Sequence, residues 1–250
     1  MTLEKFFRAV PKAALAFSGG TDSALLMAEA TRLGADVKAY FVRTPFQPEF
    51  EVRDAKRLSE ETGGKMEILP LNILTVPNVR ENGPRRCYYC KRAIFETIGR
   101  AALRDGYSVL IDGTNASDEE AGRPGMQALR ELFVRSPLRE CGITKKEVRE
   151  RSRALGLFTW DKPSYSCLAT RLPSGQEITE EALCKIEKTE TALMSLGFSD
   201  FRVRTDGKNA RLVLTEKQLP EALRLRREVL SAMKEYDTVS LDLRPREESV

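Results

Sequence analysis

A short apolar segment that runs directly into a glycine-containing loop constrains the fold of this 250-residue chain more than any other feature. Residues 13–17 read Ala-Ala-Leu-Ala-Phe, as a buried strand would, and residues 18–23 read Ser-Gly-Gly-Thr-Asp-Ser. Residues 22–33 then follow a helical pattern that ends at Gly34. In this order, the first N–H groups of the helix and its positive dipole end face the loop and can hold an anion. The segment therefore predicts a phosphate-binding loop.

Each side chain of this loop has an expected role. Gly19 and Gly20 let the backbone approach a phosphate, and Ser18 and Ser23 add hydroxyl donors. Asp22 is unsuited to a phosphate site unless Mg²⁺ lies between its carboxylate and a pyrophosphate. The loop is not a Walker A motif, because the Gly-Lys-Ser/Thr ending is missing. The alternative is an ordinary helix N-cap after a tight turn.

The rest of the chain predicts two domains. Strands expected at residues 36–42, 65–69 and 107–112 alternate with helices expected at 49–62, 88–104 and 144–155. This alternation predicts an α/β fold with a doubly wound parallel sheet, over residues 1–175.

The pattern of predicted helices and strands changes beyond a long loop at residues 158–177. Helices are expected at 180–196 and 217–234, and strands at 201–205, 210–214 and 238–243. This pattern predicts a small α+β domain over residues 176–250, with a role in substrate binding or oligomerisation.

Composition excludes several kinds of chemistry. The chain has no histidine, so Ser-His-Asp triads, Cys-His nucleophiles and His-ligated zinc are impossible. A net charge of +4 suits an anionic small molecule and does not by itself indicate nucleic acid. No apolar run approaches the length of a membrane span, and Lys5, Arg8 and Lys12 interrupt the apolar N-terminal stretch. We expect a cytoplasmic protein.

Five cysteines in such a chain indicate thiol or metal chemistry rather than a disulfide framework. Cys87 and Cys90 form a C-x-x-C pair at the start of a helix, amid arginine and lysine, which suits a metal site or a redox pair. The alternative is two ordinary buried cysteines. Cys141 and Cys184 are isolated, and we expect them to be packing residues.

Cys167 lies in the long loop between Lys162 and Arg171. Flanking cations favour the thiolate, so Cys167 is a candidate nucleophile or metal ligand. A structural cysteine is the alternative.

Residues 18–23 match the PP-loop motif, and the chain resembles the N-type ATP pyrophosphatases, such as GMP synthetase, NAD synthetase and the tRNA-thiolating enzymes. The resemblance implies cleavage of ATP between its α and β phosphates, with AMP passed to an acceptor oxygen. Asp112-Gly113-Thr114-Asn115 looks like the second nucleotide-contacting loop of these enzymes. Both loops follow strands, where ligands of open α/β sheets bind.

A narrower resemblance involves residues 160–171, which look like a loop of the LarE-type sulfur transferases of nickel-pincer nucleotide cofactor synthesis. The similarity includes the PP-loop, Asp112-Gly113 and residues 118–119, 123–125 and 201–204. It implies adenylation of a carboxylate of pyridinium-3,5-biscarboxylic acid mononucleotide and its conversion to a thiocarboxylate. It also implies ATP and Mg²⁺, and it suggests a homo-oligomer.

The LarE-type resemblance implies two possible sources of sulfur. In one branch the sulfur comes from the cysteine matched by Cys167, and that branch lacks the C-x-x-C pair. This chain has the pair and resembles the other branch, in which three cysteines, here Cys87, Cys90 and Cys167, hold a [4Fe-4S] cluster. Three thiolates leave one iron without a protein ligand, and that iron could carry an extra sulfide. The upstream sulfide donor stays open.

The resemblance also assigns roles to other residues. Cys167 and Asp22 are implied as catalytic, and Glu119 as the active-site acid, although a solvated carboxylate fits the sequence equally well. Arg202 and Arg204 are implied to hold the substrate phosphate; residues two apart on a strand share a face, and the alternative is two solvated arginines. The implied ATP contacts are Ser18, Gly19, Gly20, Asp22, Ser23 and Gly113.

Two other functions remain open on the sequence alone. One is a tRNA-thiolating PP-loop enzyme, since some of these also use three cysteines and a [4Fe-4S] cluster. The other is a zinc-stabilised nucleotide-binding protein without sulfur chemistry, in which four of the cysteines form a tetrahedral site.

Overall fold

The computed structural model describes residues 1–118 and 124–247, which fall into two compact units. The first unit comprises Met1–Val76 and Arg85–Lys162, and the second comprises Pro77–Pro84 and Pro163–Val250. In the ranges that the structure describes, no helix has both the length and the apolar character needed to cross a membrane.

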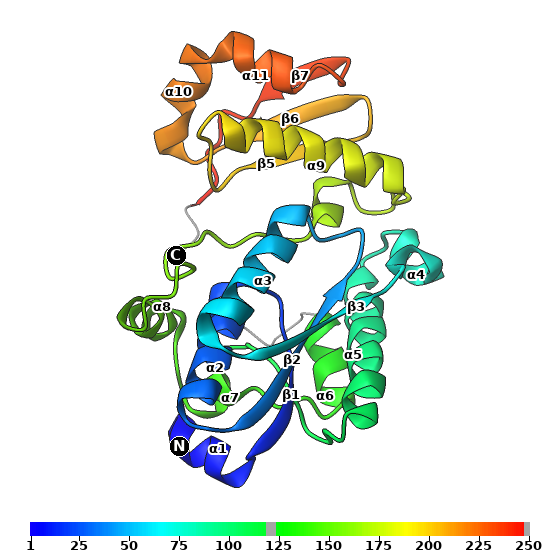
Figure 1. The fold of residues 1–250 in the computed structure, drawn as a ribbon. Helices are drawn as coiled ribbons and strands as arrows, with labels where there is room; N and C mark the ends of the chain where they lie inside the picture. The colour runs from blue at the N-terminus through cyan, green and yellow to red at the C-terminus, as the bar shows by residue number, and fades with distance from the viewer. Residues whose placement is uncertain (119–123, 248–250) are drawn as a thin grey trace. The chain divides into compact units, whose positions relative to one another are not determined.

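The first unit is built on a four-stranded sheet with the strand order β3-β2-β1-β4 (Figure 1). Its strands are β1 (Lys12–Ala16), β2 (Asp36–Arg43), β3 (Lys65–Pro70) and β4 (Leu110–Ile111). All of the neighbouring pairs are parallel. The predicted α/β fold with a parallel sheet is confirmed, although β4 is only two residues long where six were expected.

Helices cover both faces of this sheet (Figure 1). Helices α2 and α3 lie on one face, and α5 and α6 lie on the other. The helices of this unit are α1 (Leu3–Ala9), α2 (Thr21–Arg32), α3 (Glu49–Thr62), α5 (Arg86–Arg104), α6 (Pro124–Glu131), α7 (Pro137–Glu140) and α8 (Lys145–Ala154), with a 3-10 turn at Ile73–Thr75. The first unit therefore has the layers of a doubly wound domain.

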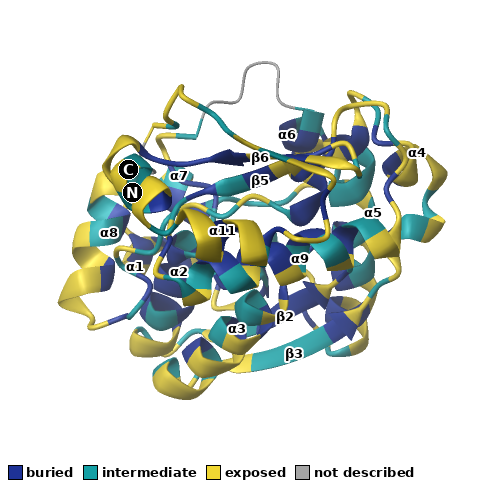
Figure 2. Cartoon of the chain, turned by 90° about the horizontal axis from the view of Figure 1, so that it is seen from above, coloured by how far each residue is buried: buried dark blue, intermediate teal, exposed yellow. Residues whose placement is uncertain are grey.

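Strand β2 shows why the sheet is buried on both sides. Phe41 packs into the core beneath α2 and α3, whereas Tyr40 and Val42 pack into the core beneath α5. Successive side chains of a strand point to opposite faces, so the central residues of a strand covered on both sides are apolar, as residues 39–42 of β2 are. In Figure 2, β2 is largely buried, whereas the edge strand β3 is mostly half-buried.

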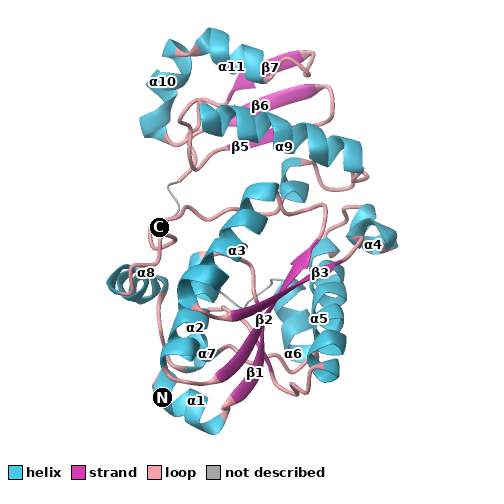
Figure 3. Cartoon of the chain, viewed as in Figure 1, coloured by secondary structure: helices cyan, strands magenta, loops and turns pink. Residues whose placement is uncertain are grey.

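The second unit contains a three-stranded sheet with the order β5-β6-β7 (Figure 3). Strands β5 (Arg202–Thr205) and β6 (Asn209–Val213) form an antiparallel hairpin, and β7 (Thr238–Leu241) adds in parallel to β6. The remaining elements are α4 (Pro77–Arg80), η2 (Leu168–Arg171), α9 (Glu180–Ser195), η3 (Glu216–Gln218), α10 (Leu219–Arg224) and α11 (Arg226–Ala232). A small C-terminal sheet domain was predicted and is present.

The single helix expected at residues 217–234 is wrong in detail. The structure has a 3-10 turn and two short helices there, and the break between the helices falls at Leu225, whose φ of −92° and ψ of +28° leave the helical region. Pro220 near the start of α10 favours a new helix start at that point rather than a helix interior.

Candidate active site

The loop between β1 and α2 closes on itself through its two serines. The hydroxyls of Ser18 and Ser23 lie 3.1 Å apart, and the Ser18 hydroxyl accepts a bond from the Gly20 N–H at 3.3 Å. Gly20 is the N-cap residue of α2 and has no side chain to cap the first turn. The N–H groups at this helix end thus keep the arrangement expected of an anion site.

Gly19 is favoured by its backbone conformation, and it lies close to α3. Its φ of +72° lies in the left-handed region, and a Cβ there would lie 3.4 Å from the carbonyl oxygen of Glu51 and from the Cβ of Ala55 in α3. Helix α3 therefore packs directly behind the loop.

The loop after β4 touches the first turn of α2. A Cβ on Gly113 would lie only 2.9 Å from the Ser23 backbone nitrogen and 3.2 Å from the Asp22 carbonyl carbon. Such contacts leave no room for a side chain. The two loops that the sequence singled out are thus brought together, and Gly113 is the residue that permits their approach.

Asp112 stabilises this second loop from within. The carboxylate is buried and accepts bonds from the Thr114 N–H at 3.2 Å, from the Thr114 hydroxyl and from the Ser136 hydroxyl at 2.7 Å. Its role in the described structure is to fix the loop that carries Gly113.

Asp22 has two partners that the sequence did not indicate. One carboxylate oxygen accepts a bond from the Asn115 side-chain amide at 3.0 Å, and the other accepts one from the Lys145 ammonium at 2.6 Å. Lys145 begins α8, and its backbone N–H donates to the Ser117 hydroxyl at 3.0 Å. These contacts join three segments that lie far apart in the sequence.

Cys87 and Cys90 lie in the first turns of α5, which begins at Arg86. Cys87 is exposed and Cys90 is half-buried, and an Nη atom of Arg86 lies 3.7 Å from the Cys87 sulfur. Residues three apart on a helix share a face, and a helix N-terminus with nearby arginine favours thiolate. The pair therefore suits two thiolate ligands of one metal group.

A complete metal site is not assembled. Within residues 1–118 and 124–247, no three Cys, Asp or Glu side chains form a group that could hold a metal ion. Cys87 and Cys90 belong to the first unit and Cys167 belongs to the second. The three-cysteine ligand set stays a prediction.

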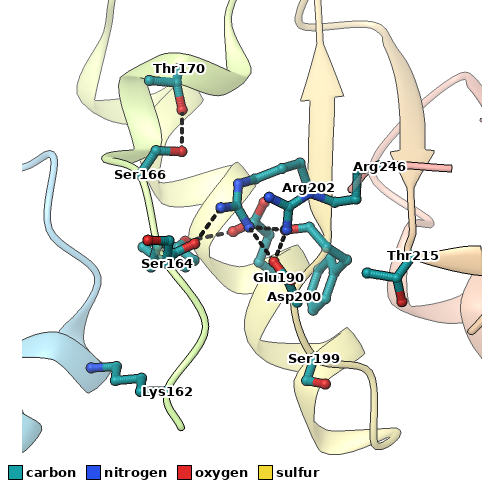
Figure 4. Close-up of polar contacts among 12 residues, drawn as sticks. Lys162, Ser164, Ser166, Thr170, Glu190, Ser199, Asp200, Arg202, Thr215 and Arg246 are labelled. Atoms are coloured by element: carbon teal, nitrogen blue, oxygen red, sulfur yellow. Dashed lines mark hydrogen bonds and ion pairs between the residues drawn. The ribbon is translucent and has the colours of Figure 1, made fainter. Parts of the chain in front are cut away.

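Cys167 sits at the start of a short 3-10 turn, η2, and its side chain is half-buried. Its carbonyl oxygen accepts bonds from the Thr170 N–H at 3.0 Å and from the Thr170 hydroxyl at 2.8 Å. The Thr170 hydroxyl also lies 3.0 Å from that of Ser166 (Figure 4). These bonds fix the backbone on both sides of the thiol.

Arg171, one of the two cations expected to flank Cys167, stabilises the Cys167 turn from inside the second unit. Its side chain is fully buried and forms a double hydrogen bond with Glu190, at 2.8 Å and 3.0 Å. Its remaining donors reach the Ser166 carbonyl at 2.9 Å and the Thr170 hydroxyl at 2.8 Å. Burial alone would lower the pKa of Arg171, but the bonds to Glu190 outweigh it and raise the pKa.

Lys162, the other predicted cation, also has a carboxylate partner. Its ammonium lies 2.5 Å from the Asp54 carboxylate in the first unit. Its charge is therefore offset by Asp54.

Arg202 and Arg204 occupy the same face of β5, as their spacing predicted, because Val203 and Thr205 point into the core. Arg202 is mostly buried. Its guanidinium donates one hydrogen bond to the Ser164 carbonyl and one to the Phe201 carbonyl, both at 2.6 Å (Figure 4). Burial lowers the pKa of Arg202 to about 10, and nearby arginines act in the same direction. Arg202 thus holds the segment just before Cys167.

Arg204 is exposed and faces a cavity of about 610 Å³. Arg211 on β6 lies directly opposite Arg204 in the hairpin and lines the same cavity, together with residues 170–173 of the Cys167 turn. Like charges placed opposite each other on a sheet repel, and the charge of Arg211 is partly offset by the Asp242 carboxylate, which lies 3.5 Å from it. Arg211 was missed in the sequence, although the hairpin register could have revealed it.

Comparisons with known proteins identify the family. No family model matches this chain. The pyridinium-3,5-bisthiocarboxylic acid mononucleotide synthase of Lactiplantibacillus plantarum is 31% identical over 246 residues, covering 96% of this chain and 89% of that protein. The chain belongs to the LarE-type sulfur transferase family.

Two uncharacterised proteins share this similarity. One, from Synechocystis sp., is 39% identical over 220 residues, or 88% of this chain and 82% of that protein. The other, from Methanocaldococcus jannaschii, is 31% identical over 225 residues, or 90% and 86%. Membership of the LarE-type family makes this chain an enzyme and does not favour a tRNA thiolase or a zinc-stabilised scaffold. It leaves the cysteine branch untested.

The predictions for three other residues of this LarE-type chain, Glu119, Cys141 and Cys184, can also be compared with the structure. Glu119 lies outside the described residues. Cys141 packs against the core of the first unit, as expected, and burial raises the pKa of its thiol. The packing role expected for Cys184 is wrong, because its side chain is exposed on α9.

Proposed function

We propose that this chain is an ATP-dependent sulfur transferase of nickel-pincer nucleotide cofactor biosynthesis. It adenylates a carboxylate of pyridinium-3,5-biscarboxylic acid mononucleotide and converts it to a thiocarboxylate. The observation that carries the proposal is the 31% identity, over 96% of the chain, to the Lactiplantibacillus plantarum synthase. The geometry of the two units supports it.

The first unit supplies the activation step in this proposal. The helix end at Gly20 and the loop serines bind the phosphates of ATP, and Gly113 lets the second loop close against them. A substrate carboxylate oxygen attacks the α-phosphorus, the bond from this phosphorus to the β-phosphate oxygen breaks, and pyrophosphate leaves with the electron pair. Mg²⁺, when bound, would offset phosphate charge, with Asp22 as its carboxylate ligand.

The second unit supplies substrate recognition. Arg204 and Arg211 face one cavity and present two guanidiniums suited to a phosphate dianion. Arg202 is already committed to the Ser164 carbonyl, so we assign it mainly to positioning the Cys167 segment. The pair of arginines expected on β5 is thereby replaced by one arginine on β5 and one on the neighbouring strand β6.

The sulfur step needs a thiol or a sulfide. We propose Cys87, Cys90 and Cys167 as ligands of a [4Fe-4S] cluster, supported by the thiolate-favouring position of the pair at the start of α5. When bound, such a cluster would have one iron without a protein ligand, which could carry a replaceable sulfide.

The cluster is tested by metal analysis. We expect anaerobically purified protein to be brown and to hold about four iron and four sulfide per chain. Replacing Cys87 and Cys90 together with serine should remove the iron, whereas replacing the exposed Cys184 with serine should not. Colourless anaerobic protein with stoichiometric zinc would contradict the cluster.

The function itself is tested with the pyridinium dicarboxylate mononucleotide, MgATP and sulfide under anaerobic conditions. We expect thiocarboxylate product by mass spectrometry and stoichiometric pyrophosphate. Asp22→Asn should lower pyrophosphate release at least about 100-fold, because the variant loses the carboxylate that is proposed to bind Mg²⁺, and the phosphate charge is then less well offset. Asp36→Asn is the matched control: Asp36 begins β2, away from the loops that follow the carboxyl ends of the strands, and this variant should retain activity. Thiolated tRNA in place of this product would overturn the proposal.

A further inference from the structure

Residues 77–84 leave the α/β unit in the middle of a strand-to-helix connection. They lie between β3 and α5 along the chain, yet they belong to the second compact unit, together with Pro163–Val250. Connections of this kind in α/β domains usually take about two to six residues and stay within the domain. Helix α5, which carries Cys87 and Cys90, begins directly after this excursion.

Asn82 binds residues 77–84 to the chain that follows Cys167. Its side-chain amide donates to the Pro173 carbonyl at 2.8 Å, and its own carbonyl accepts bonds from the Gly175 N–H at 2.9 Å and from the Ser174 hydroxyl at 3.3 Å. The residue is only 3% exposed, so water does not compete for these bonds. We call the contacts between Asn82 and residues 173–175 the Asn82 clip.

The residue type at position 82 suits this role. Its φ of +55° lies in the left-handed region, which asparagine tolerates better than most residues. Glycine would adopt this conformation but has no amide, and a carboxylate in the same place could not donate to a carbonyl. The Arg80–Glu177 ion pair also joins the two segments, but both side chains are more than half exposed, and such pairs add little. Among the polar side chains of this segment, Asn82 therefore contributes most.

The clip limits how far apart the proposed sulfur-handling thiols can lie. Cys87 follows Asn82 by five positions, and Cys167 precedes Pro173 by six. An extended chain spans at most about 3.3–3.6 Å per residue, so Cys87 lies within about 18 Å of the clip. On the other side, the 3-10 turn η2 shortens the span, because it rises only about 2 Å per residue. The clip therefore bounds the separation of two cysteines that are far apart in the sequence.

We propose that Asn82 is a positioning residue for the sulfur step. By holding residues 77–84 on residues 173–175, it keeps Cys87 and Cys90 within reach of Cys167. It contacts neither nucleotide nor substrate in this role. The inference rests on the proposed function, in which these three thiols act together, but its first test needs no turnover.

The test asks whether a short bismaleimide joins Cys87 to Cys167 in iron-free protein. Three substitutions, Cys90→Ser, Cys141→Ser and Cys184→Ser, leave only these two thiols. We expect mass spectrometry to show both cysteines joined in most molecules, and Asn82→Asp to lower the joined fraction at least about 10-fold, because the bond to the buried carbonyl is lost. Arg80→Met removes only the exposed ion pair and should cross-link like the two-cysteine protein. Equal cross-linking with Asn82→Asp, or none in the two-cysteine protein, would overturn the inference.

Val229→Ala separates positioning from a general loss of stability. Val229 is buried in the core cluster formed by residues 193–241 of the second unit, so its truncation weakens this unit without changing the clip. We expect this variant to cross-link like the two-cysteine protein. Equal losses of cross-linking in Val229→Ala and Asn82→Asp would show that Asn82 acts only through stability.

Turnover gives an independent readout. With all five cysteines present, Asn82→Asp should lower thiocarboxylate formation while pyrophosphate release stays measurable, because the proposed ATP loops belong to the first unit. Full thiocarboxylate formation by this variant would contradict the inference. Wild-type protein that forms no thiocarboxylate would instead contradict the proposed function, and the cross-linking result would still decide the role of Asn82.

Discussion

Cys167→Ala should abolish thiocarboxylate formation, lowering it at least about 100-fold, while pyrophosphate release stays measurable. Cys167 begins the η2 turn of the second unit, whereas the proposed ATP loops belong to the first. Removal of the thiol should therefore leave the activated acyl-adenylate without its sulfur source. Product mass and released pyrophosphate are measured on the same reaction.

The control for this experiment is Cys184→Ser, which changes an exposed thiol on α9 in the same unit and should leave both readouts intact. Persistent thiolation by Cys167→Ala would make Cys167 a structural residue. The mass of spent wild-type protein then distinguishes the two sulfur sources. A loss of about 34 Da marks a cysteine that has given up its sulfur, and unchanged mass after several turnovers favours a sulfide held on iron.

Among the variants described here, Arg171→Met should cause the largest loss in the free energy of unfolding. Glu190 would keep a buried carboxylate without its cation, and breaking a buried ion pair in this way costs about 3–5 kcal/mol. The loss is measured by hydrogen exchange of the β5 amides, since the Val203 N–H donates directly to Glu190 at 2.9 Å. The Cys167 turn should loosen at the same time, because Arg171 also holds Ser166.

Two further variants make this result specific. Arg171→Met with Glu190→Gln should recover part of the lost stability, because glutamine is neutral and can still accept the Val203 bond. Arg80→Met breaks the exposed pair with Glu177 in the same unit, and it should cost less than about 1 kcal/mol. An equally small effect of Arg171→Met would show that the buried pair does not stabilise the turn.

Local patterns accounted for much of the first unit. The helix predicted at residues 49–62 is α3 (Glu49–Thr62), because its apolar face is encoded within the segment and Gly63, in the left-handed conformation, ends it. The Thr144–Glu147 capping box was likewise visible as two residues three apart. Short elements were predicted less well: α7, with four residues, is too short to show a period, and the strand expected at residues 107–112 has only the two residues of β4.

The contacts between distant segments could not be read in this way. The sequence placed Lys162 and Arg171 beside Cys167, but it could not show that Glu190 would meet Arg171, because that depends on how α9 packs on the turn. Asp22 was recognised as unusual for a phosphate loop, yet Lys145 lies 123 residues away and becomes its partner only when α8 packs against α2. Packing, rather than local preference, decides such pairs.

The contact at Gly113 sets a limit on how this site can be redesigned. A Cβ added at Gly113 would lie only 2.9 Å from the Ser23 nitrogen, so there is no room for a side chain where the two loops meet. Exchanging the second loop for one from another nucleotide enzyme would succeed only if the graft also brought glycine to this place. Protein engineers who wish to alter the nucleotide preference of the chain would have to treat both loops as one indivisible part.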